Sequence, residues 1–281
     1  MEWLIEPFNY SYILKAHLVS LFLCSFCGFL SCFLILKSYS LLADALSHSV
    51  TPGVIIAYMT SFSYTISSFL CGIFALCSMA LVTGNSKLKT DTIIGVVFSS
   101  FFALSLFLVS IFSIPIKLES VFLGDILSLD DGEVFELGVL ITILFGFMIL
   151  SFSKIKFIFF DELGASIAGI NVKLYRLLFF MLLCFCTVAS LKTVGAILIT
   201  AMLITPGASA FMICKSFNKM AILAAFFGGF SGFFGVYLSY FLDTYASAMI
   251  VLTQCVIFIV CFLYKRLKIA NLHFLKVAKN V

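Results

Sequence analysis

The amino-acid sequence predicts an all-α protein that crosses a lipid bilayer about nine times. Hydrophobic residues make up 63% of the 281 residues and charged residues only 11%, with a mean hydropathy of +1.23. Soluble domains are about 45–50% apolar and about 25% charged, so this composition excludes an ordinary soluble domain. Long unbroken apolar runs also exclude a transmembrane β-barrel, whose strands alternate apolar and polar residues. The net charge of +4 does not indicate a nucleic-acid partner.

The predicted spans follow from the apolar runs, because a helix needs about 20 apolar residues to cross a bilayer. The first run lacks the basic segment and cleavage site of a signal peptide, so we expect it to be retained as a helix. Short loops between the runs predict one transmembrane domain over residues 1–281. The predicted spans lie near residues 18–36, 42–62, 66–82, 92–112, 134–153, 174–190, 194–213, 220–240 and 247–264.

The basic residues predict the orientation of the spans. Alternate loops and the tail at 265–281 carry 14 of the 17 Lys and Arg residues, and most acidic residues lie on the other side. Cytoplasmic loops carry an excess of Lys and Arg, so we predict an N-terminus outside and a C-terminus in the cytoplasm. The basic tail is expected to rest on anionic lipid headgroups.

A carboxylate and an imidazole interrupt the second apolar run. Asp44 and His48 are four residues apart, and a helix places residues at this spacing on one face. An Asp inside a bilayer costs about 2.5–3.5 kcal/mol on insertion scales, which points to a function. Carboxylate oxygen and imidazole nitrogen together suit a divalent transition metal. The alternative is a polar pair that only hydrogen-bonds within the bundle.

Two Thr-Pro-Gly triplets interrupt apolar runs in two different spans. Proline lacks a backbone N–H, so we expect the helices to break at Pro52-Gly53 and at Pro206-Gly207. Broken helices at matching places frame the transport site in many transporters, whereas simple kinks are the alternative.

Small residues four apart, Gly228 and Gly232, let two helices approach closely. We expect this step to pack against another helix of the same chain, with a subunit interface as the alternative.

A polar segment between the fifth and sixth spans predicts a short cytoplasmic helix at about 160–170. Asp161 and Glu162 lie where a helix N-terminus favours negative charge, and Gly169 suits the C-terminal end. Gly164 and Ala165 give this helix small residues that would let another protein approach closely. An ordinary interfacial turn is the alternative.

The sequence indicates no enzymatic activity of its own. It contains no Gly-x-x-x-x-Gly-Lys-Ser/Thr loop, so an ATP-driven step would need a separate ATPase chain. Apart from Asp44 and His48, the spans are almost free of ionisable groups, and no nucleophile–base arrangement is evident.

The stretch from Leu42 to His48, followed by Pro52-Gly53, resembles the signature of the metal-ion permeases of ABC importers, the zinc, manganese and iron family. Further segments resemble motifs of this family in the same order. They are similar to its outer-loop motif, its ATPase-contacting coupling helix, its Pro-containing helix and the outer end of its penultimate span, at residues 122–127, 160–172, 194–210 and 238–243.

The resemblance implies a permease subunit in the cytoplasmic (inner) membrane of a bacterium. Its implied partners are a second copy of the chain, two ATP-binding subunits, an extracytoplasmic metal-binding protein and the lipid bilayer. It implies that Asp44 and His48 line the route of a transported divalent metal, with manganese or iron favoured over zinc and no permanently bound cofactor. Residues Asp161, Glu162, Gly164, Ala165 and Gly169 would couple the permease to the ATPase.

A proton-coupled secondary metal transporter is the main alternative function. Such a transporter needs ionisable coupling residues inside its own spans, and only Asp44 is well placed for that role. A membrane scaffold without transport activity would leave Asp44 and His48 without a role.

Overall fold

The computed structural model describes residues 6–60, 62–112, 124 and 126–278. The outer-loop residues Phe122, Leu123 and Asp125 lie outside the described residues, as do residues 279–281 of the basic tail. The elements are η1 (Glu6–Asn9), α2 (Ser11–Leu36), α3 (Ser40–Ser49), α4 (Thr51–Thr60), α5 (Tyr64–Asn85), α6 (Thr90–Phe112), α8 (Asp131–Phe160), α9 (Glu162–Ile167), α10 (Val172–Ile213), α11 (Phe217–Leu242) and α12 (Ala246–Ala278).

Helices make up this architecture, and nine helical stretches among the described residues are long and apolar enough to cross a membrane. The predicted fold class is therefore confirmed. Each predicted span falls within one stretch, apart from residues 61 and 62 at the end of the second. The second span consists of α3 and α4 together, and α10 contains the sixth and seventh spans in one helical run.

The run of α10 changes direction at a single glycine. Gly195 has φ 76° and ψ 166°, a backbone conformation that is essentially restricted to glycine. The outer-loop residue Gly124, with φ 63°, lies directly against this break, because an added Cβ atom would collide with the backbone of Val194. The break thus separates the sixth and seventh spans and forms a seat for Gly124, which lies between α6 and α8.

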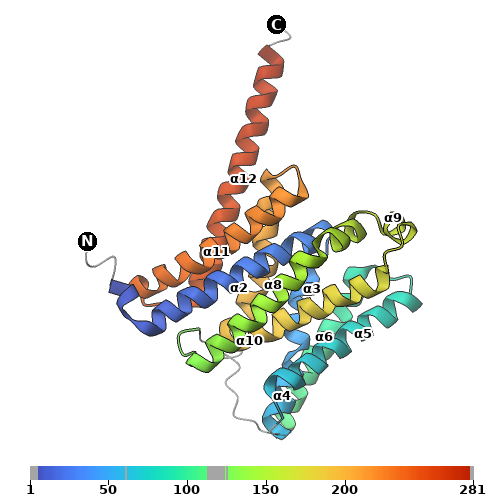
Figure 1. The fold of residues 1–281 in the computed structure, drawn as a ribbon, viewed down its shortest axis with the longest axis vertical. Helices are drawn as coiled ribbons and strands as arrows, with labels where there is room; N and C mark the ends of the chain where they lie inside the picture. Colours follow the sequence, from blue (N-terminus) through green and yellow to red (C-terminus); the bar gives the residue numbers. More distant parts are fainter. Residues whose placement is uncertain (1–5, 61, 113–123, 125, 279–281) are drawn as a thin grey trace.

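The helices α2 and α11 form the most extensive contact between described helices and lie side by side in Figure 1. A Cβ atom on Gly28 would collide with the carbonyl oxygen of Ala224, and one on Gly228 would collide with that of Cys24. Gly232 lies against Ser20 and Cys24 of the same helix α2. The predicted small-residue contact is therefore made within this chain.

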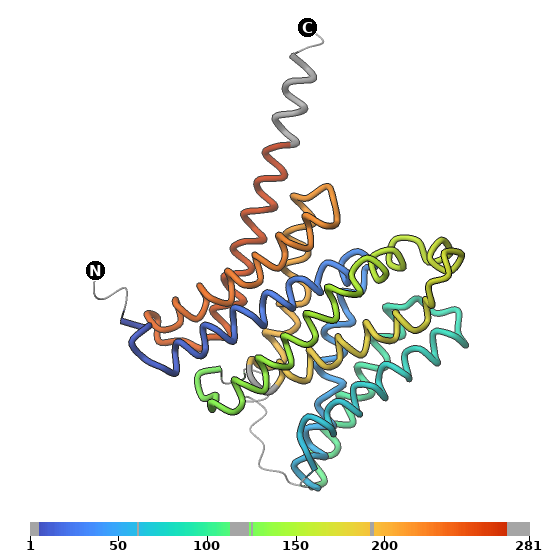
Figure 2. Tube along the Cα trace, viewed as in Figure 1, coloured from blue at the N-terminus to red at the C-terminus, as the bar shows by residue number. Residues whose placement is uncertain are grey.

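The last helix leaves the bundle. α12 packs on α10 and α11 over its first part and then points away from the body, as the tube in Figure 2 shows. Lys265, Arg266 and Lys268 are exposed on this departing part.

Candidate functional site

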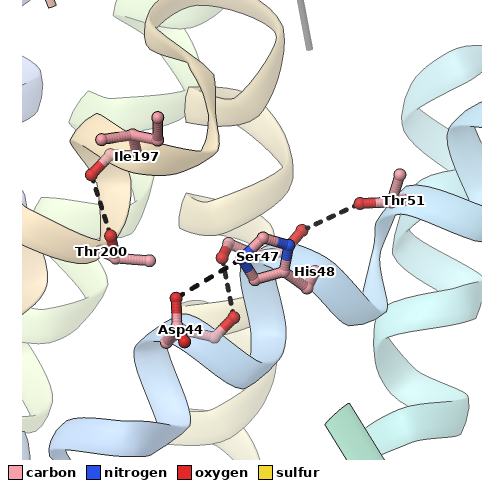
Figure 3. A network of polar contacts seen from close by, with 6 residues as sticks. All are labelled: Asp44, Ser47, His48, Thr51, Ile197 and Thr200. Atoms are coloured by element: carbon pink, nitrogen blue, oxygen red, sulfur yellow. Dashed lines mark hydrogen bonds and ion pairs between the residues drawn. The ribbon is translucent and has the colours of Figure 1, made fainter. Parts of the chain in front are cut away.

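The short helix α3 places Asp44 and His48 on one face, as their spacing predicts (Figure 3). The Asp44 Oδ1 atom lies 3.5 Å from the His48 Nε2 atom. The Asp44 side chain is 45% exposed and the His48 side chain 19% exposed. A carboxylate and an imidazole thus share an open face of a helix that belongs to a membrane span.

Two rings of α6 hold the imidazole of His48. The centroids of Phe98 and Phe102 lie 5.1 and 5.4 Å from that of His48, and both rings meet it edge to face. The two phenylalanines also stack on each other, with centroids 6.0 Å apart. This apolar support leaves the Nε2 edge of His48 directed at Asp44.

The helix break directly after His48 fixes the site from the other side. α3 ends at Ser49 and α4 begins at Thr51, so Pro52 lies in the first turn of α4, where a missing N–H costs no hydrogen bond. Gly53 brings α4 against α5, because an added Cβ atom would lie 2.6 Å from the carbonyl oxygen of Ser67. The junction of the two helices is thus at Val50, two residues before the predicted break, and Pro52 and Gly53 lie in the first turn of α4.

The second Thr-Pro-Gly triplet behaves differently. Pro206 lies inside the helical run of α10, and the non-helical residue of that run is Gly195. Proline removes one backbone donor but its φ fits a helix, whereas the positive φ of Gly195 does not. The break in α10 is thus at Gly195 and not at Pro206-Gly207, and Gly207 instead packs against the Ser31 backbone of α2.

A second wall of the site comes from α10, which packs against α3. Figure 3 places Ile197 and Thr200 of α10 opposite Asp44. The Thr200 hydroxyl donates to the Ile197 carbonyl oxygen at 2.9 Å, and Ile197 is exposed although it lies in a span. These two residues were not predicted, because nothing in their local sequence relates them to Asp44.

The pair alone does not complete a metal site. Within the described ranges, no group of three or more His, Cys, Asp or Glu side chains could hold a metal ion. If Asp44 and His48 bound a metal ion, they would supply one oxygen and one nitrogen ligand, and further ligands would have to come from water, backbone or another chain.

The short helix α9 (Glu162–Ile167) lies within the predicted range of about 160–170 but is shorter, and it exposes a different face. Asp161 accepts a hydrogen bond from the Gly164 N–H at 2.9 Å, and its carboxylate occupies the space that a Gly164 side chain would need. Ala165 is fully buried against the body, whereas Leu163 and Ile167 are 79% and 88% exposed.

Several contacts anchor α9 to the rest of the protein. Glu162 forms an ion pair with Arg176 of α10. Gly169 ends the segment with φ 79°, and Asn171 caps α10 by accepting a hydrogen bond from the Leu174 N–H at 3.1 Å. The small residues therefore build the helix and its contact with the body, and Leu163 and Ile167 form its outer surface.

Nine candidate membrane spans among the described residues, the second of them divided into α3 and α4 and carrying the Asp44–His48 pair, define a multi-pass membrane transport protein. The chain matches the ABC 3 transport family over residues 9–265 and belongs to this family. It is 40% identical over 264 residues to the chelated iron transport system membrane protein YfeC of Yersinia pestis, which covers 94% of this chain and 90% of that one.

Two further comparisons agree with this assignment. The manganese transport system membrane protein MntC of Listeria monocytogenes is 35% identical over 256 residues, which is 91% of each chain. The solved structure of PsaBC from Streptococcus pneumoniae in complex with Fab is similar with a TM-score of 0.84 and 30% identity, over 93% of this chain and 95% of that one.

Proposed function

We propose that the chain is the permease subunit of an ABC importer that carries Mn²⁺ or Fe²⁺ into the cytoplasm, with Zn²⁺ the next choice. The observation that carries the proposal is the Asp44–His48 pair, an oxygen and a nitrogen ligand 3.5 Å apart on an open face of a broken membrane span. The names of the relatives support iron or manganese as the cargo.

A second copy of the chain completes the route in this proposal. A half-exposed carboxylate in a membrane span is costly against lipid, and such residues face a bundle interior or a water-filled cavity. Pairing of two copies over the open face of α3 would enclose Asp44 and bring a second Asp44–His48 pair to the route. Cargo released into the cytoplasm must be bound weakly, which suits a site of few protein ligands.

The ATP-driven step belongs to a separate ATPase chain that docks on α9. The two exposed side chains of α9, Leu163 and Ile167, are one helical turn apart and give an apolar contact for the ATPase. The excess of Lys and Arg on this side supports a cytoplasmic location, with the C-terminus on the same side and the N-terminus facing the extracytoplasmic metal-binding protein. The membrane is then the inner membrane of a bacterium.

Uptake of radioactive Mn²⁺ by proteoliposomes tests the source of energy. Vesicles that contain the permease and its ATPase should take up metal only with hydrolysable ATP, and a proton uncoupler should have no effect. Uptake without ATP that an uncoupler abolishes would instead establish the proton-coupled transporter.

Co-purification of the ATPase with α9 variants tests the docking surface. The double change Leu163→Ser/Ile167→Ser should lose the ATPase, since it removes both apolar contacts without touching the Asp161 cap. The matched change Leu81→Ser/Leu88→Ser also alters two exposed leucines near one membrane face and should retain it. Full ATPase recovery with the α9 variant would contradict the docking assignment.

A further inference from the structure

An apolar groove opens where α12 diverges from α11 near the end of α10. Its volume is about 480 Å³. Pockets that bind small molecules have volumes of about 300–1,000 Å³, so the groove falls in this range. Phe226, Phe230, Val256, Val260, Cys261 and Tyr264 are among its lining residues, and no charged side chain lines it. Such a cavity recognises a flexible apolar group.

The groove faces the hydrocarbon layer. Its lining on α11 and α12 lies inside two candidate membrane spans, Phe217–Leu242 and Ala246–Lys268. Cys261 is buried and forms part of the floor, whereas Phe226 and Val260 are exposed at the edges. Phe226 stacks on Phe230 with centroids 6.2 Å apart, which gives one edge a continuous aromatic surface.

Basic residues gather at one end of this groove. Lys265, Arg266 and Lys268 follow the lining residue Tyr264, and they are exposed. Lys268 Nζ lies 5.9 Å from the centroid of the Tyr264 ring. Tyrosine is enriched at the level of lipid headgroups, so this end of the groove lies at the membrane surface.

Two further lysines extend the basic end, and no carboxylate of these helices neutralises it. Lys215 and Lys219 are exposed just after the lining residue Ile213. The sequence contains no Asp or Glu at positions 163–242 or 244–281. A positive cluster thus adjoins an apolar groove. The two features are complementary to the headgroup and the acyl chain of an anionic lipid, respectively.

We propose that the groove binds an acyl chain of an anionic phospholipid, whose phosphate is held by Lys268, one turn beyond the lining residue Tyr264, and by Lys265. The charge also argues against a second copy at this place. Two copies in the same membrane orientation have their basic ends at the same membrane surface, so pairing over this groove would bring two positive clusters close together.

Native mass spectrometry of the full-length protein in detergent tests the proposal, with phosphatidylglycerol and phosphatidylcholine of identical acyl chains as probes. We expect phosphatidylglycerol to bind about tenfold more tightly or better, because each basic residue near the surface favours an anionic headgroup. Soluble glycerol phosphate should not displace it, since that probe lacks the acyl chain.

Two variants distinguish binding of the lipid acyl chain from binding of the lipid headgroup. Val260→Trp fills the groove from an exposed position, and Leu252→Trp is its control on an exposed part of α12 outside the groove lining. The triple change Lys265→Gln/Arg266→Gln/Lys268→Gln removes the basic end, and Lys87→Gln/Lys89→Gln/Lys173→Gln removes the same charge elsewhere. Val260→Trp and the first triple should each weaken phosphatidylglycerol binding about tenfold, and both controls should bind like the wild type.

Equal affinity for both lipids, or unchanged binding by Val260→Trp and the first triple, would overturn the proposal. So would a change from dimer to monomer in light scattering that Val260→Trp causes and Leu252→Trp does not, because a second copy would then cover the groove.

Discussion

The helix pair α2–α11 and the helices α5 and α6 beside the Asp44 helix differ in how tightly they are packed. α2 and α11 meet backbone to backbone through glycines, and the most apolar window of α2 is 67% buried. The span Ser40–Thr60, which carries Asp44, has the same buried share of 67%, whereas only 22% and 28% of the residues are buried in the corresponding stretches of the neighbouring α5 and α6. The tightly packed pair stabilises the fold, whereas α5 and α6 leave much of their surface uncovered beside the helix that carries Asp44.

The glycine contact should be the most sensitive point of the molecule. Gly228→Ala places a methyl group on the Cys24 carbonyl, so the two helices must separate at a cost of about 1–3 kcal/mol or more. Gly146→Ala on α8 meets no atom within 4 Å and should gain up to about 1 kcal/mol from helix propensity. Thermal unfolding in detergent measures the melting temperatures of both variants. Similar melting temperatures would show that the α2–α11 contact is no more sensitive to an added methyl group than α8 is.

The break at Gly195 lies in α10, which packs against both α2 and α3. We expect substitutions there to have the next largest effect on stability. Gly195→Ala forces a side chain into a conformation that costs about 1–3 kcal/mol, and it disturbs the seat of Gly124. Gly84→Ala, where no atom lies within 4 Å, is the control. A thermal shift assay should rank Gly195→Ala well below the control; equal stability would contradict the break.

A buried amide on α12 predicts a gain in stability. Gln254 is 2% exposed, and neither its Oε1 nor its Nε2 atom has a hydrogen-bond partner within the described part of the chain. Leaving a buried polar group unsatisfied costs about 1–3 kcal/mol, so Gln254→Met should raise the melting temperature. Thr253→Val is the comparison, since the Thr253 hydroxyl already donates to the Met249 carbonyl. A lower melting temperature for Gln254→Met would indicate a partner for this amide.

The smallest change in stability is expected at an exposed ion pair between α2 and α8. Lys15 of α2 pairs with Asp131 of α8, whose side chain is 86% exposed. Exposed ion pairs contribute about 0–1 kcal/mol, so Lys15→Gln should change the unfolding free energy by no more than this. A chemical denaturation series that shows a larger loss would assign Lys15 a role beyond the pair.

The spans could be predicted from the sequence because each depends on a contiguous apolar run. The Asp44–His48 contact was equally accessible, since four-residue spacing on a helix is a local property. The Gly195 break was not predictable, because one glycine in an apolar run does not reveal its own φ. The contacts of His48 with Phe98 and Phe102 join distant segments, which no local pattern encodes.

The same limit applies to α9. Its capping residues and length follow from local sequence, but the side that faces outward depends on how the helix lies against the body. Ala165 therefore proved buried, and Leu163 with Ile167 took the exposed positions.

The central claim is that the Asp44–His48 pair lies on the metal route. The most direct measurement is metal uptake by proteoliposomes that contain the ATPase and either Asp44→Asn, His48→Ala or the control Asp91→Asn, which removes a carboxylate from the exposed start of α6. Each of the first two should lower uptake about tenfold or more, as losses at metal sites do, with wild-type thermal stability and expression. Asp44 should dominate for Mn²⁺, and His48 should matter comparably for Fe²⁺ or Zn²⁺. Wild-type uptake rates in both variants would show that the pair is structural and that the metal takes another route.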